Sequence, residues 1–284
     1  MASSYGVTPN DIRLAMGMKP DDTDIFSDAE LETIIEHAEA EAEKLLDGVY
    51  TKKTTTEYRT SRDGSNLLML EKKPIMRVVN ITVGGSAVTP KFAKVFNNSG
   101  KIILSNDAEK TKWDSTEERN NIIKYNYGKL DETSTETTTI ATSTAGTGRN
   151  IAVADETGFN VNDYVKFESI EVELGTGYCY PEITKVTGTA SNQITCDISY
   201  NHGTGTRIVK METPQSVKRF IIVTGGIMAA LHTIGATYTF QTSYSIEGYT
   251  TNKGVPYPHF EKVFNSLVDE RNLLLSRLRN VTVV

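Results

Sequence analysis

The spacing of the apolar residues changes twice along this chain, and no other feature constrains the fold as strongly. Apolar residues recur at helical spacing from Leu31 to Val49, alternate in short runs from Thr54 onward, and return to helical spacing after Thr213. Helices at the two ends must cover each other's apolar faces. We therefore predict an α+β chain: a helical-bundle core with a β-hairpin segment and an inserted all-β small barrel or sandwich domain.

The helical segments carry their own start signals. Ser27 stands before acidic residues as an N-cap, so the first long helix begins there. A short helix is predicted after Thr8. From Pro214 to about Ala236 the pattern is apolar on nearly every side, which is typical of a buried helix. Pro256 and Pro258 precede a closing helix.

The segment between the helices is rich in strand signals. Residues 54–70 are predicted as a hairpin around the turn at 62–65, and a second strand pair breaks at Gly84 and Gly85. Ten of the twenty residues in 131–150 are Ser or Thr, so we interpret this stretch as a linker. Five short strands are expected beyond it: Asn150–Ala154, Asp163–Glu168, Glu182–Val186, Gln193–Ile198 and Arg207–Met211. Residues 1–136 and 213–284 then form the helical core with its hairpin segment, and residues 137–212 form the inserted domain.

Charge excludes some functions and suggests another. The chain has 30 basic and 36 acidic residues, a net charge of −6, which is the wrong sign for a general nucleic-acid coat. No apolar run approaches the roughly 18 residues of a membrane span, and the first ten residues do not resemble a signal peptide, so we expect no membrane partner. Residues 1–50 alone carry a net charge of −9. The polar side of the first long helix carries Glu32, Glu36, Glu39 and Glu43. These glutamates form either a solvated face or, in a ring of subunits, a channel wall that repels DNA.

No set of residues in the sequence carries a recognisable chemistry. The four histidines are not at metal-ligand spacing, and the run Asp21–Asp24 fails as a calcium loop because Ile25 and Phe26 follow it. Cys179 and Cys196 are interpreted as buried free thiols. We therefore predict no enzyme, no cofactor and no metal site.

Four stretches, in this order, resemble the head-tail adaptor, or connector, proteins of tailed bacteriophages and related tailed viruses. The stretches are Val7–Leu14 leading to Ser27–Ile35, Leu67–Val78 with Ile81–Gly85, Thr213–Ala236, and Tyr244–Tyr249 before Phe260–Arg279. The resemblance implies a ring of identical subunits, twelve in most relatives, in the neck of a virion assembled in the host cytoplasm. Its implied partners are the portal protein, a tail or tail-completion (stopper) protein, and double-stranded DNA that passes without sequence-specific binding.

The same resemblance assigns roles to the end of the chain. The closing helix and the uncharged tail after it would dock against the portal, and a β-prone terminus suits strand addition to a partner. The candidate portal-docking residues are Arg277, Arg279, Val281, Val283 and Val284.

The inserted domain has no counterpart in most members of that family, and its likeness to small β-domains of virion structural proteins leaves its partner open. A capsid contact is one expectation. The alternative function is a virion surface binding module whose inserted β-domain recognises a glycan or a protein, with Tyr164, Tyr178 and Tyr180 as candidate contacts.

Overall fold

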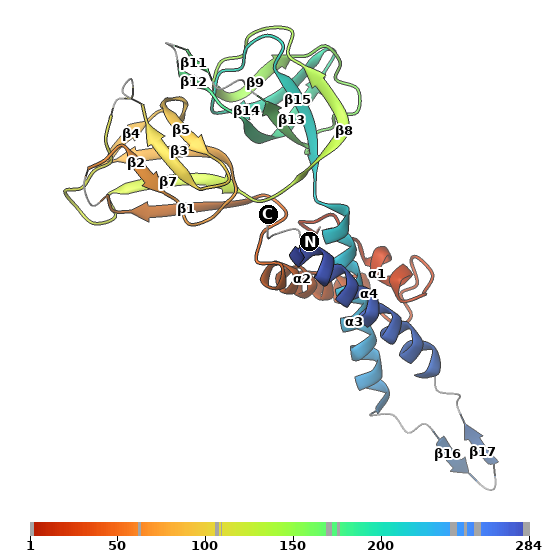
Figure 1. Ribbon diagram of the computed structural model, residues 1–284. Coiled ribbons are helices and arrows are strands. Elements are labelled where there is room, and N and C mark those ends of the chain that lie inside the picture. Colours follow the sequence, from red (N-terminus) through yellow and green to blue (C-terminus); the bar gives the residue numbers. More distant parts are fainter. Residues whose placement is uncertain are drawn as a thin grey trace. The chain divides into compact units, whose positions relative to one another are not determined.

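The chain forms two compact units in a computed structural model, residues 1–50 with 213–284 (unit 1) and residues 51–212 (unit 2) (Figure 1). The structure describes residues 3–61, 64–105, 108, 110–168, 172–174, 177–238, 243–246, 249–252 and 257–280. Of these, the backbone alone is described at 172–174, 177–179, 233–238, 243–246, 249–252, 257–261 and 279–280.

Unit 1 is built from helices. Its elements are α1 (Pro9–Ala15), α2 (Asp28–Leu45), α3 (Gln215–Tyr238) and α4 (Tyr257–Asn280), with the two-stranded sheet of β16 (Ser243–Ile246) and β17 (Tyr249–Asn252) between α3 and α4. The predicted cap at Ser27 and the predicted short helix after Thr8 are confirmed. Thr8 and Ser27 each accept a backbone hydrogen bond at the third helical position, and Asp11 and Glu30 return the bond to complete two capping boxes.

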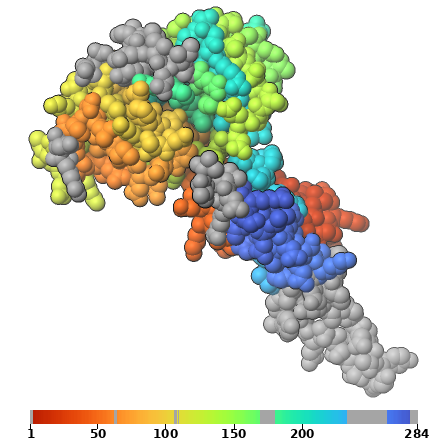
Figure 2. Space-filling view, viewed as in Figure 1, coloured from red at the N-terminus to blue at the C-terminus, as the bar shows by residue number. Residues whose placement is uncertain are grey.

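Helix α3 lies at the centre of unit 1 and packs against the other three helices. Its side chains Val217, Phe220 and Ile221 are buried together with Leu31 and Ile35 of α2. Figure 2 shows part of α4, in dark blue, at the surface of this unit. None of the described helices combines the length and the apolar character that crossing a membrane requires.

Unit 2 begins with two antiparallel sheets that share one core. The four-stranded sheet has the order β1 (Lys53–Arg59), β7 (Asn121–Tyr127), β3 (Ile75–Val83), β4 (Ser86–Val88), and the three-stranded sheet has the order β2 (Leu67–Met69), β6 (Lys101–Leu104), β5 (Ala93–Phe96). A 3-10 helix, η1 (Pro90–Phe92), precedes β5. Trp113, the single tryptophan of the chain, is buried between the sheets with Ile81 and Ile123.

The predicted hairpin over residues 54–70 is wrong. β1 pairs with β7, about 65 residues further along the chain, and β2 pairs with β6. Alternation identifies a strand but not its partner, because any strand with a matching buried face can supply the ladder. The turn at Gly84 and Gly85 is confirmed: both residues have positive φ, and β3 and β4 pair across them.

The second part of unit 2 is a small barrel. Its six-stranded sheet has the order β8 (Asp131–Thr138), β15 (Arg207–Glu212), β10 (Tyr164–Glu168), β13 (Glu182–Ala190), β14 (Gln193–Ile198), β9 (Gly146–Ala152). The short pair β11 (Val172–Leu174) and β12 (Gly177–Cys179) lies between β10 and β13 in sequence. The outer strands meet at the bridge between Thr139 and Val153, so the sheet closes on itself. Its interior is apolar and contains Val165, Phe167 and Ile194.

The interpretation of residues 131–150 as a linker is also wrong, because β8 and β9 occupy most of this stretch. Thr137 and Thr139 are buried, and threonine is a good strand former because it branches at Cβ. Most of the other side chains of β8 are exposed or half-buried, so this strand needs no large apolar residues.

The predicted fold class needs the largest correction. The described chain contains both helices and strands, but thirteen strands lie in three antiparallel sheets and the α-helices number four, so a helical-bundle core is wrong. Long helices give strong periodic signals, whereas strands of three to nine residues give weak ones, so the sequence pattern favours a helical core. The observed boundaries at Tyr50 and Glu212 put both β segments in one unit.

Candidate functional site

The acidic face of α2 carries the glutamates that were expected to line a channel. Leu31, Ile35 and Ala38 of this helix are buried in the core, and the glutamates lie beside this apolar stripe. Glu36 is exposed, whereas Glu32, Glu39 and Glu43 are half-buried.

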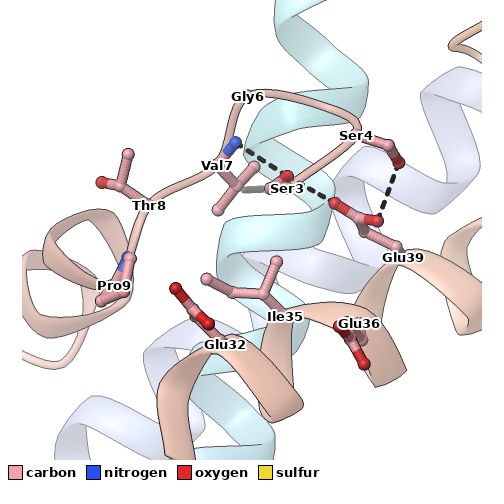
Figure 3. A pocket seen from close by; sticks show the side chains of 10 residues that line it. All are labelled: Ser3, Ser4, Gly6, Val7, Thr8, Pro9, Glu32, Ile35, Glu36 and Glu39. Atoms are coloured by element: carbon pink, nitrogen blue, oxygen red, sulfur yellow. Dashed lines mark hydrogen bonds between the residues drawn. The ribbon is translucent and has the colours of Figure 1, made fainter. Parts of the chain in front are cut away.

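The N-terminal segment lies over part of this face (Figure 3). The hydroxyls of Ser3 and Ser4 donate hydrogen bonds to the two carboxylate oxygens of Glu39, the latter at 2.9 Å. The Tyr5 hydroxyl donates to Glu43 Oε1 at 2.7 Å. Burial, followed by this bond to Glu43, raises the pKa of Tyr5. Two of the four glutamates therefore hold the N-terminal segment against α2.

Beside these bonds lies a hollow of about 350 Å³ between the N-terminal segment and α2. Its lining includes Glu32, Glu36 and Glu39, together with Val7 and Ile35. The hollow thus has an acidic rim and an apolar floor.

The candidate portal-docking residues fall largely outside the described part of the chain. Arg277 is exposed on α4. Arg279 lies in α4 by its backbone, but its side chain is outside the description, and Val281, Val283 and Val284 lie outside the described residues.

The histidines and cysteines set aside in the sequence have simple surroundings. His37 and His232 are exposed on α2 and α3. Cys196 is buried in β14, and burial raises the pKa of its thiol to about 12. The side chain of Cys179 is outside the description. In the described part of the chain, no group of three His, Cys, Asp or Glu side chains could hold a metal ion.

Unit 2 contains a buried polar cluster that was not predicted from the sequence. Glu182, whose side chain is fully buried, accepts backbone N–H bonds from Ser199 and Tyr200 at 2.9–3.0 Å. His202 Nε2 lies 2.9 Å from Glu182 Oε1, and its ring stacks on Phe167 with centroids 4.5 Å apart.

Arg77 of β3 joins this cluster from the four-stranded sheet. Its Nε donates to Ser199 Oγ at 2.9 Å and lies 3.6 Å from Glu182. Ser199 in turn donates to the Val78 carbonyl at 2.6 Å. The cluster therefore fastens the barrel to the sheet, because its partners come from both parts of unit 2.

One sequence signal could have revealed the cluster. In β13, burial alternates, so Glu182, Thr184 and Val186 share the inward face. A carboxylate at an inward position of a strand must be paired or hydrogen-bonded. The alternating pattern therefore predicts a buried partner, although it cannot name Arg77 or His202.

Arg77 also lines a cleft of unit 2 that involves both of its parts. The cleft has a volume of about 480 Å³. Its basic side chains are Arg77, Lys91 of η1 and Arg149 of β9. The polar part of the lining includes Thr142, Thr144, Thr147, Ser199 and Asn201, and the apolar part includes Val79, Pro90 and Ile198.

The tyrosines proposed as surface contacts of the barrel differ in accessibility. Tyr180 is buried and meets Tyr200 edge to face, with ring centroids 5.6 Å apart. Tyr164 is half-buried, and burial raises its pKa. The side chain of Tyr178 is outside the description. The described tyrosines thus serve packing more than recognition.

No family model matches the chain, and no curated protein matches it. Among solved structures, it is similar to the Gp54 tailspike of Acinetobacter baumannii bacteriophage AP22, determined in complex with A. baumannii capsular saccharide. The similarity covers 29% of this chain and 15% of the tailspike chain, with 15% sequence identity and a TM-score of 0.24. A TM-score this low carries no argument about fold or function.

Proposed function

We propose that the chain is a virion structural protein that forms a ring between the portal and the tail of a tailed virus and lets DNA pass through its centre. The observation that carries this proposal is that unit 1 is assembled from the two ends of the sequence. Helices from the two ends of the sequence, separated by residues 51–212, share one core around α3. These helices contain three of the stretches that resemble head-tail adaptors.

The decisive experiment is cryo-electron microscopy of purified virions, focused on the neck. We expect density for unit 1, with its helices α2, α3 and α4, as a ring between portal and tail. The chain at the tail tip, or its absence from the particle, would overturn the adaptor role.

The docking of the chain end is tested by deleting residues 280–284. We expect the truncated chain to fold and to bind the portal more weakly in co-assembly, because a β-prone terminus can add a strand to a partner sheet. Equal co-assembly of the truncated and full chains would remove this part of the proposal.

The channel role of α2 is tested by a triple variant, Glu32→Gln, Glu36→Gln and Glu39→Gln. If this face repels the DNA backbone, DNA packaging or release changes. Because Glu39 also binds the N-terminal segment, the single variant Glu36→Gln serves as the control that removes charge from an exposed position alone. Normal infectivity of both variants would assign the face to solvent.

A second candidate function is a surface binding module in unit 2. The observation that favours it is the 480 Å³ cleft, whose volume is in the usual range for ligand sites of roughly 300–1,000 Å³. A glycan array probed with the full chain tests it. Reproducible binding to any glycan supports a binding module, and uniform failure on the array opposes it.

A further inference from the structure

We propose that the cleft of unit 2 binds a saccharide that carries a carboxylate, such as a uronic acid residue. The inference deepens the second candidate function and does not depend on the adaptor role. It rests on the charge of the cleft, on how one of its cations is held, and on the remaining walls.

Three cations from three separate elements gather at this cleft: Arg77 from β3, Lys91 from η1 and Arg149 from β9. The positive charge of Arg77 is balanced by two carboxylates, since its guanidinium lies 3.6 Å from Glu182 and 3.7 Å from Asp197. No carboxylate in the described part of the chain forms an ion pair with Lys91 or Arg149. The cleft therefore keeps an excess of positive charge, which favours an anionic ligand.

Arg77 is held in place before any ligand arrives. Its side chain is about nine-tenths buried, with a relative exposure of 10%. Ser199 accepts from its Nε and is itself fixed by its bond to the Val78 carbonyl. A guanidinium fixed in this way loses little conformational entropy when it binds a carboxylate.

The remaining walls suit a sugar ring. Thr142, Thr144 and Thr147 have exposed side chains in the strand connection before β9 and at its start, where their hydroxyls can exchange hydrogen bonds with sugar hydroxyls. Val79 and Pro90 offer apolar surface to the C–H face of a ring. A nucleic-acid backbone needs a basic stripe along which several phosphates bind, whereas these cations surround one cavity.

The test uses the full chain and isothermal titration calorimetry with tetragalacturonate. The fully methyl-esterified tetragalacturonate keeps the sugar hydroxyls without the charge, and inorganic phosphate supplies charge without a sugar. We expect tetragalacturonate to bind at least about tenfold more tightly than either, because charge-assisted bonds to a carboxylate are the strong ones. We also expect its affinity to fall with added salt.

The double variant Lys91→Gln/Arg149→Gln should weaken tetragalacturonate binding by about tenfold or more. Both side chains reach solvent, so the variant should keep its fold, which circular dichroism checks. The matched control is Lys112→Gln, an exposed lysine of unit 2 outside the cleft lining, and it should bind like the unchanged chain.

Each alternative result has a definite meaning. Equal binding of the methyl ester overturns carboxylate recognition but leaves a glycan-binding module intact. Equal binding of phosphate overturns saccharide recognition, and so does tighter binding of an acidic peptide covering residues 27–45 of this chain. Absence of tetragalacturonate binding, or unchanged binding by the double variant, overturns the inference while the glycan array still decides the second candidate function.

Discussion

At the residue scale, Glu182 has the most demanding position in unit 2. Its buried carboxylate is stabilised by hydrogen bonds from two backbone N–H groups and by the nearby side chains of His202 and Arg77. Removing the carboxylate leaves Arg77 and His202 buried with fewer partners. The loss of folding free energy is therefore larger than the net contribution of the Glu182–Arg77 ion pair.

We therefore predict that Glu182→Ala lowers the free energy of unfolding of unit 2 by about 3–5 kcal/mol. Urea titration followed by tryptophan fluorescence measures this directly, since Trp113 is the single tryptophan and lies in the core of unit 2. The control Glu117→Ala removes an exposed carboxylate and should change the unfolding free energy by less than about 0.5 kcal/mol. A similar small change for Glu182→Ala would contradict the assigned role.

Cys196 gives a second prediction at this scale. Its pKa is raised to about 12, so the reactive thiolate is scarce at pH 8, on the order of one molecule in ten thousand. In a Cys179→Ser variant, which isolates this thiol, we expect iodoacetamide to leave the native chain unmodified over an hour and to label it rapidly in urea. Rapid labelling of the folded chain at pH 8 would show that Cys196 is accessible.

At the element scale, α3 determines how closely the helices of unit 1 approach. A Cβ at Gly225 would lie 2.7 Å from Ile12 Cδ1 of α1, and a Cβ at Gly226 would lie 3.0 Å from Leu267 Cδ1 of α4. Glycine is usually unfavourable inside a helix by about 1 kcal/mol, so its presence twice in succession reflects packing against α1 and α4.

Gly225→Leu should therefore destabilise unit 1 by about 1–3 kcal/mol, the usual cost of overpacking a core. Thermal or urea unfolding followed by helical circular dichroism measures the change. In the background of Ile12→Ala, which clears the nearest side chain, the same substitution should cost less. An equal cost in both backgrounds would mean that the contact with Ile12 is not responsible.

The ion pair between α3 and α4 predicts a pH dependence. Arg219 donates two hydrogen bonds of 2.7 Å to Glu270, and these bonds lower the pKa of Glu270 below its ordinary value of 4.5. The pair therefore stabilises unit 1 above about pH 4.5, and this contribution disappears as the pH falls through the lowered pKa. Both side chains are at least one-third exposed, so the contribution is about 0.2–1 kcal/mol.

We expect Glu270→Gln to lower the unfolding free energy of unit 1 by this amount at pH 7 and to have a smaller effect near about pH 2.5, because the glutamate is increasingly protonated there. Helical circular dichroism in urea at the two pH values provides the measurement. The neighbouring exposed variant Asp269→Asn should have little effect at either pH. A difference for Glu270→Gln that persists undiminished at the lower pH would exclude the ion pair as its cause.

At the scale of the whole molecule, the two units have separate cores and different charge. Unit 2 has a continuous chain with two main apolar clusters of its own, one between the four- and three-stranded sheets and one inside the barrel. Its acidic and basic residues are equal in number, whereas residues 1–50 of unit 1 carry a net charge of −9 and residues 213–284 carry a net charge of +3. The net charge of −6 therefore comes from unit 1.

We predict that residues 51–212 fold when expressed alone. The fragment should show a cooperative urea transition by Trp113 fluorescence, with a midpoint close to that of the same signal in the full chain. A fragment without a cooperative transition would mean that unit 2 depends on unit 1.

The sequence by itself determined the elements whose signals are local. The cap at Ser27, the short helix after Thr8, the buried α3 and the turn at Gly84 and Gly85 were predicted, because capping, periodicity and turn geometry depend on residues a few positions apart.

Only the tertiary structure decided which strands pair and which polar groups meet. β1 pairs with β7 rather than with its neighbour, the Thr-rich residues 131–138 become a barrel strand, and Arg77 reaches Glu182 across more than a hundred residues. The physical reason is that alternation specifies only that a strand has a buried face. Its partner is chosen by the packing of distant segments into a common core, which no local pattern records.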